Sequence, residues 1–85
     1  MMARLSGVFA LQLRTRMLKK RSFTIARHRT SVALEPEFWA VLEQEAQRRK
    51  SSLAALVMAI DAARGGNPLA SALRLCALAA ARRPS

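Results

Sequence analysis

The residues most often used for catalysis or metal binding are scarce in this chain of 85 residues. Cys76 is its single cysteine and His28 its single histidine, so one chain can form neither a disulfide nor a closed four-ligand zinc site. Glu43 and Glu45 stand two positions apart in a segment predicted to be helical, where side chains at that spacing do not face each other. The glycine pair at 65–66 lacks the Gly-Lys-Ser/Thr spacing of a phosphate-binding loop. We therefore expect no enzymatic activity, no metal site and no cofactor.

The strongest indication of function in this sequence is its positive charge. Fifteen lysines and arginines stand against five aspartates and glutamates, which gives a formal net charge of +10. Residues 1–34 carry eight basic groups and no acid, whereas residues 35–63 hold all five acids. This excess favours a polyanionic partner at the N-terminal end, either a nucleic acid or an anionic membrane surface. A hydrophobic content of 52% argues against disorder, and 5% aromatic residues are typical of a Leu- and Ala-rich helical protein.

The chain divides into an arm and a single domain. Residues 1–18 are predicted to be a basic, disordered arm or an over-extended start, because Met17 would also suit a first residue. The apolar run at 8–13 is too short for the core of a signal peptide or for a transmembrane helix. Residues 19–82 are expected to form the domain, and the use of only one cysteine fits a reducing cytoplasm.

A strand is predicted at residues 29–34, where polar and apolar side chains alternate with period two. Phe23 and Ile25 also alternate, but with the opposite parity, so we expect a break or bulge near residues 26–28. On this interpretation the strand at 29–34 has no partner within the chain. A lone strand leaves backbone groups unpaired, and a domain this small is only marginally stable as a monomer. Antiparallel pairing with the same strand of a second copy, in a homodimer, is the expected solution.

Two to three helices should follow the strand. Apolar residues at helical spacing predict helices at 36–49, 52–64 and 68–82. Pro36 suits the first turn of the first helix, Ser51 or Ser52 can cap the second, and the glycine pair at 65–66 ends it. Trp39 and Cys76 lie on apolar stripes and are expected in a core or an interface. The fold class is therefore mainly α.

This order of elements resembles the ribbon-helix-helix fold of MetJ and Arc. More narrowly, residues 19–80 are similar to the small bacterial ribbon-helix-helix domain family, in motifs that keep their order and spacing: Lys20–Thr24, His28–Val32, Leu34–Trp39, Ile60–Asn67 and Ser71–Arg74. The resemblance implies a sequence-selective DNA-binding protein, acting in transcription regulation as a homodimer. Paired strands would enter the major groove of double-stranded DNA as a β-ribbon.

The resemblance also implies two classes of DNA contact. Arg29, Ser31 and Ala33 occupy the outward ribbon positions that contact bases, where Ala33 departs from the basic residue usual in the family. A methyl group can touch thymine but cannot form a hydrogen bond, so direct readout should be weaker here. The phosphate contacts would come from the start of the second helix and from the segment before the strand: Lys50, Ser51, Ser52 and Arg27.

Two alternatives remain open at this point. An antitoxin-like regulator would bind DNA and also dock a partner protein on the apolar stripe of its C-terminal helix, residues 68–82. A membrane-surface protein would use residues 1–21 as a basic amphipathic anchor, and we expect this less than DNA binding. The favoured location is the cytoplasm, in association with the nucleoid.

Overall fold

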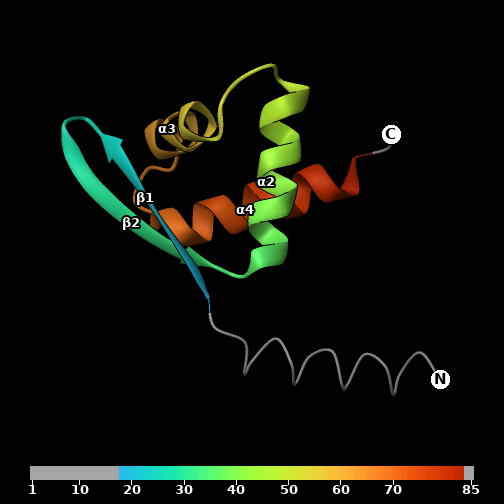
Figure 1. The fold of residues 1–85 in the computed structure, drawn as a ribbon, viewed down its shortest axis with the longest axis horizontal. Helices are drawn as coiled ribbons and strands as arrows, with labels where there is room; N and C mark the ends of the chain where they lie inside the picture. The colour runs from blue at the N-terminus through green and yellow to red at the C-terminus, as the bar shows by residue number, and fades with distance from the viewer. Residues whose placement is uncertain (1–17, 84–85) are drawn as a thin grey trace.

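The computed structural model describes residues 18–83, in which a two-stranded hairpin precedes three helices (Figure 1). The predicted arm at 1–18 lies almost wholly outside the described residues. The elements are β1 Lys19–Ile25, β2 His28–Leu34, α2 Pro36–Arg48, α3 Leu53–Ala63 and α4 Leu69–Arg82. A mainly helical fold with an N-terminal ribbon is thus confirmed, and the helices differ from the predicted bounds by at most one residue at either end.

The expectation of a lone strand is wrong. β1 pairs antiparallel with β2 in the same chain, with Ile25 opposite His28 and Lys19 opposite Leu34. The connection is a two-residue turn, in which Ala26 and Arg27 both have positive φ, at 52° and 70°. Two consecutive residues in the left-handed backbone conformation give a turn whose twist matches that of the flanking strands. The parity change between Phe23 and the strand at 29–34 was therefore the mark of a hairpin turn, and the chain supplies its own partner strand.

The hairpin has one apolar face, which covers the helices. Phe23, Ile25, Val32 and Leu34 lie on this face; Val32 and Leu34 are buried, and Phe23 and Ile25 are partly buried. β2 packs on α4, and the three helices also pack on one another. The buried core is completed from the helices by Trp39, Leu42, Ala46, Leu56, Val57, Leu73 and Ala77.

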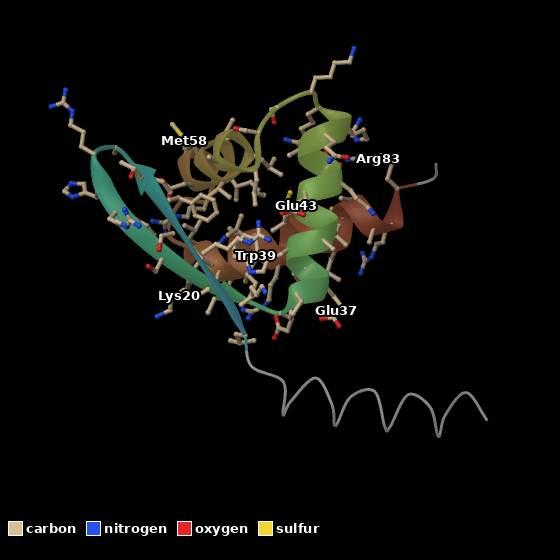
Figure 2. The ribbon with its side chains drawn as sticks, viewed as in Figure 1. Lys20, Glu37, Trp39, Glu43, Met58 and Arg83 are labelled. Atoms are coloured by element: carbon tan, nitrogen blue, oxygen red, sulfur yellow. The ribbon has the colours of Figure 1, made fainter. Side chains whose placement is uncertain are left out.

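Trp39 fastens β1 to α2. Its indole Nε1 donates a hydrogen bond of 2.8 Å to the carbonyl oxygen of Lys19, and its ring lies 5.9 Å from the ring of Phe23. The guanidinium of Arg21 stands 5.2 Å from the indole centroid and donates to Glu43 Oε2 at 2.6 Å. Figure 2 shows Trp39 between the hairpin and α2. The hairpin is therefore held on the helices by packing, a hydrogen bond and an ion pair together.

A buried carboxylate joins the C-terminal ends of α2 and α4. Glu45 is only 3% exposed, and its oxygens accept hydrogen bonds from Arg48, Arg49 and Arg83 at 2.6 to 3.0 Å. These hydrogen bonds, first those of Arg48 and Arg83, hold the pKa of the Glu45 carboxyl far below its usual range. Arg83 lies beside α2 although it comes from the end of α4 (Figure 2).

The predicted stripe of α4 is used within the chain. Leu73 and Ala77 are buried, Leu69 and Cys76 are partly buried against the same core, and burial raises the pKa of the Cys76 thiol. The exposed Leu75 lies on another face of the helix. Much of the stripe that was predicted as a possible docking surface therefore contributes to the core of this chain.

A charge at the buried face of β2 should unfold the domain, whereas the same charge one residue later should be tolerated. Val32→Glu places a carboxylate under the hairpin and should cost several kcal/mol of unfolding free energy. Ala33→Glu points outward, across from Lys20, and should leave stability nearly unchanged. Urea unfolding followed by the fluorescence of the single tryptophan, Trp39, measures both. Equal stability of the two variants would contradict the observed strand register.

The Glu45 cluster should make stability depend on acid. Because the folded-state pKa of Glu45 is lowered, its stabilising contribution is present above the ordinary glutamate pKa of about 4.3 and is lost as the pH falls below it. Glu45→Gln should therefore lower the melting temperature at pH 7, and the deficit should shrink toward pH 3. Glu43→Gln, at an exposed ion pair on the same helix, should change little. A deficit for Glu45→Gln that is independent of pH would argue against the cluster.

Candidate nucleic-acid interface

The outward face of the hairpin is polar, basic and free of acids. Because side chains alternate along a strand, the residues opposite to the apolar face all point away from the helices: Lys20, Ser22, Thr24, Arg29, Ser31 and Ala33. All except Ala33 are exposed. Lys20 points away from the helices in Figure 2. This face combines two cations and three hydroxyls, which are groups that donate hydrogen bonds to phosphates and bases.

The three predicted base-contact residues share this face. Arg29 lies opposite Thr24, Ser31 opposite Ser22, and Ala33 opposite Lys20. The hydroxyls of Ser22 and Ser31 are 3.0 Å apart and form a hydrogen bond across the two strands. Arg29, Ser31 and Ala33 are thus accessible together on one surface, and their contact with bases stays a prediction.

Half of this surface comes from residues that the sequence interpretation did not assign. Lys20, Ser22 and Thr24 belong to β1, which was not predicted as a strand. Lys20 stands directly across from Ala33, so β1 supplies the cation that β2 lacks at that position. The signal for this was present in the sequence, since Phe23 and Ile25 alternate with the polar residues between them.

The predicted phosphate contacts at 50–52 lie in the turn between α2 and α3. Ser52 caps α3, because its Oγ accepts a hydrogen bond of 3.0 Å from the backbone N–H of Ala55. The N–H groups of Lys50 and Ser51 donate to carbonyl oxygens in the last turn of α2, as in a Schellman motif. Ser51 Oγ donates to the carbonyl oxygen of Ser52 at 3.3 Å. Lys50 and both serines are exposed.

The structure does not bring this turn to the hairpin. Figure 1 shows the turn between α2 and α3 at the end of α2 that points away from the hairpin. Arg27 lies in the two-residue turn of the hairpin, close in the chain to Arg29. Within one chain, Lys50, Ser51 and Ser52 are therefore separate from the hairpin, which carries Arg27 together with the predicted base-contact residues.

A family model for the ribbon-helix-helix domain matches residues 18–81, which is most of the chain. The chain belongs to this family. Ribbon-helix-helix domains are in general DNA-binding domains of transcription regulators and not enzymes. No curated protein and no solved structure matches the chain.

Residues 18–83 contain no group of three or more His, Cys, Asp or Glu side chains that could hold a metal ion. None of the helices described is long and apolar enough to cross a membrane.

Two of the predicted phosphate-binding cations occupy strained backbone positions. Arg27 has φ 70° and Lys50 has φ 57°, in the left-handed region where glycine is favoured. Lys50 follows the C-cap of α2, a position at which glycine is the usual residue. The hairpin turn requires this conformation at Arg27 and the end of α2 requires it at Lys50, and a glycine would relieve the strain at either position.

If Arg27 serves a DNA contact, relieving its strain should trade binding for stability. Arg27→Gly removes an unfavourable left-handed side chain and should raise the unfolding free energy by about 1 kcal/mol, while DNA affinity falls through the lost charge. Ala26→Gly relieves the same kind of strain without losing charge, so it should stabilise the protein and leave DNA affinity unchanged. Urea unfolding and fluorescence anisotropy with a labelled duplex give the two quantities. Unaltered DNA affinity of Arg27→Gly would remove Arg27 from the interface.

Proposed function

We propose that this ribbon-helix-helix protein is a sequence-selective DNA-binding protein that regulates transcription as a homodimer. The observation that carries the proposal is the outward face of the hairpin, which presents Lys20 and Arg29 among three hydroxyls and no acid. The major groove of B-DNA admits a two-stranded β-ribbon, and arginine there can bind guanine O6 and N7. The cytoplasm, with its nucleoid, is the compartment that suits this function.

The free edge of β2 supports a homodimer. Ile25 and His28 flank a two-residue turn and pair with each other, so the backbone groups of alternate residues point away from the hairpin. On β2 these outward groups belong to Arg29, Ser31 and Ala33. An open edge of this kind can pair with another strand. Pairing two β2 strands about a two-fold axis at Ser31 sets Arg29 opposite Ala33 of the second copy, so no like charges meet.

The other edge is less suited to the dimer axis. β1 begins with three consecutive cations, Lys19, Lys20 and Arg21, so joining two β1 strands would gather six positive charges at one seam. β2 contains no lysine and only one arginine, Arg29, in each copy. Charge therefore favours β2 over β1 as the strand at the axis.

The second helix also supports association. α3 is apolar around nearly its whole circumference, although only Leu56 and Val57 are buried. The residues that remain exposed are small or apolar: Ala54, Ala55, Met58, Ala59, Ala62 and Ala63. A helix that is apolar on all sides is usually covered. A second copy of the chain would cover part of this surface.

Base readout and phosphate binding should fail differently on mutation. Arg29→Ala should cost on the order of 1–3 kcal/mol on the preferred sequence and less on scrambled DNA. Lys50→Ala should weaken binding to both sequences alike and reduce the slope of log affinity against log salt concentration. Arg82→Ala, an exposed arginine at the far end of α4, serves as the control and should change neither.

The measurement is fluorescence anisotropy with two duplexes, one selected by the protein from a random pool and one scrambled, at several salt concentrations. If Arg29→Ala and Lys50→Ala both bind like Arg82→Ala, the hairpin and the turn between α2 and α3 are not the DNA-binding surface. The function proposed here would then be wrong.

A further inference from the structure

The hairpin makes the sheet of the proposed dimer wider than a two-stranded ribbon. If two β2 strands pair at the two-fold axis, each brings its β1 strand with it, and the order across the sheet becomes β1, β2, β2, β1. Neighbouring strands are about 4.8 Å apart, so the two outer strands would be about 14 Å apart. The major groove is about 12 Å wide. Only the central strands can therefore lie deep in the groove, and the outer strands must lie over its rims, where the phosphates are.

We propose that β1 is a phosphate-binding strand, which grips the DNA backbone on each side of the groove while β2 contacts the bases. This inference rests on the DNA-binding dimer proposed above. The site consists of the outward side chains of β1, namely Lys20, Ser22 and Thr24. Its ligand is the phosphodiester backbone of duplex DNA.

The chemistry of β1 suits this ligand. Lys20 is an exposed cation, and Ser22 and Thr24 are exposed hydroxyls, which are among the side chains that most often contact phosphate oxygens. The backbone N–H groups of the same three residues point to the outer edge of the sheet, because their neighbours at 19, 21, 23 and 25 pair with β2. Side chains and main chain thus both offer donors at the edge that would face the phosphates.

The surroundings of β1 hold it in place for this task. Arg21 points to the opposite face, where Glu43 and Trp39 occupy its guanidinium, so it does not compete for the outward side. The hydrogen bond between the hydroxyls of Ser22 and Ser31 links β1 to β2 on the outward face of the hairpin. A phosphate held by β1 would consequently set the position of β2 over the bases.

The first experiment asks which strand lies at the axis. In a Cys76→Ala background, Ser31→Cys would place two thiols across the two-fold axis, with Cα atoms about 5.5 Å apart and within disulfide reach. Ser22→Cys is the matched control, because Ser22 lies directly opposite Ser31 but would stand about 14 Å from its copy. Mild oxidation should cross-link Ser31→Cys and leave Ser22→Cys monomeric on a non-reducing gel.

The opposite result would place β1 at the axis and overturn the inference while leaving a dimer. Cross-linking of neither variant would remove the paired-edge dimer itself, and the inference with it.

The second experiment measures the grip on phosphate, using the two duplexes described above. Lys20→Ala should weaken binding to the selected and scrambled duplexes by the same factor. It should also reduce the salt slope by about two units, since a dimer loses two contacts of about 0.9 unit each. Lys19→Ala is the control, because Lys19 is the neighbouring exposed cation on the other face of the same strand. It removes the same charge and should leave the slope nearly unchanged.

Two results would overturn the role of β1 without touching the proposed function. One is a loss confined to the selected duplex, which would make Lys20 a base contact. The other is an equal salt slope for Lys19→Ala and Lys20→Ala, which would mean that both lysines contribute only to the overall positive charge and that neither contacts a specific phosphate. Absence of DNA binding by the unmutated protein would instead contradict the proposed function.

Discussion

The two-residue turn at Ala26 and Arg27 is the constraint on which the rest of the ribbon depends. It sets the register in which Ile25 faces His28, and every later pair along the hairpin follows from that one. A shift of one residue would turn Val32 and Leu34 to solvent and bring Arg29 and Ser31 against the helices. The turn requires two residues with positive φ, and the chain accepts this strain without a glycine at either position. The separation of an apolar and a basic face thus begins in the turn.

Packing of the hairpin on the helices then stabilises this register. The indole of Trp39 is buried beneath β1 and donates a hydrogen bond to the Lys19 carbonyl oxygen, so the start of the hairpin is anchored to α2. At the other end of α2, the Glu45 carboxylate gathers three arginines and fastens the end of α4. A buried carboxylate with fewer partners would be destabilising, and the three guanidiniums offset the loss of hydration. The helices therefore form a rigid base under a ribbon whose outer face is free.

The outer face gains its character from both strands. β2 alone offers Arg29, a hydroxyl and a methyl group, which is a weak set for reading bases. With β1 beside it, the surface gains Lys20 opposite Ala33 and two further hydroxyls. The proposed division, with β2 over bases and β1 over phosphates, follows from the width of a sheet compared with the width of the groove. This arrangement would place Lys20 of each copy beside the phosphates on the two sides of the major groove.

Local patterns in the sequence were sufficient for the helices and for the fold class. Helix ends depend on nearby residues such as Pro36, Ser52 and the glycine pair at 65–66, and a helix satisfies its own backbone hydrogen bonds. The common face of Arg29, Ser31 and Ala33 likewise followed from period-two alternation, and the resemblance to the ribbon-helix-helix family implied that this face points outward. A segment that forms its hydrogen bonds internally can therefore be predicted without knowledge of distant residues.

The tertiary structure decided what the strand pairs with and what surrounds each charge. A strand satisfies its backbone only through another segment, and the pairing of β2 with β1 depended on a turn without glycine, asparagine or aspartate to mark it. The roles of Glu45 and Arg83, 38 positions apart in the sequence, depended on how the ends of α2 and α4 meet. The stripe on α4 could have faced a partner protein or its own core, and only the packing against α2 and α3 showed that it faces the core. Periodicity along one segment determines which side chains share a face, but it carries no information about which other segment covers that face.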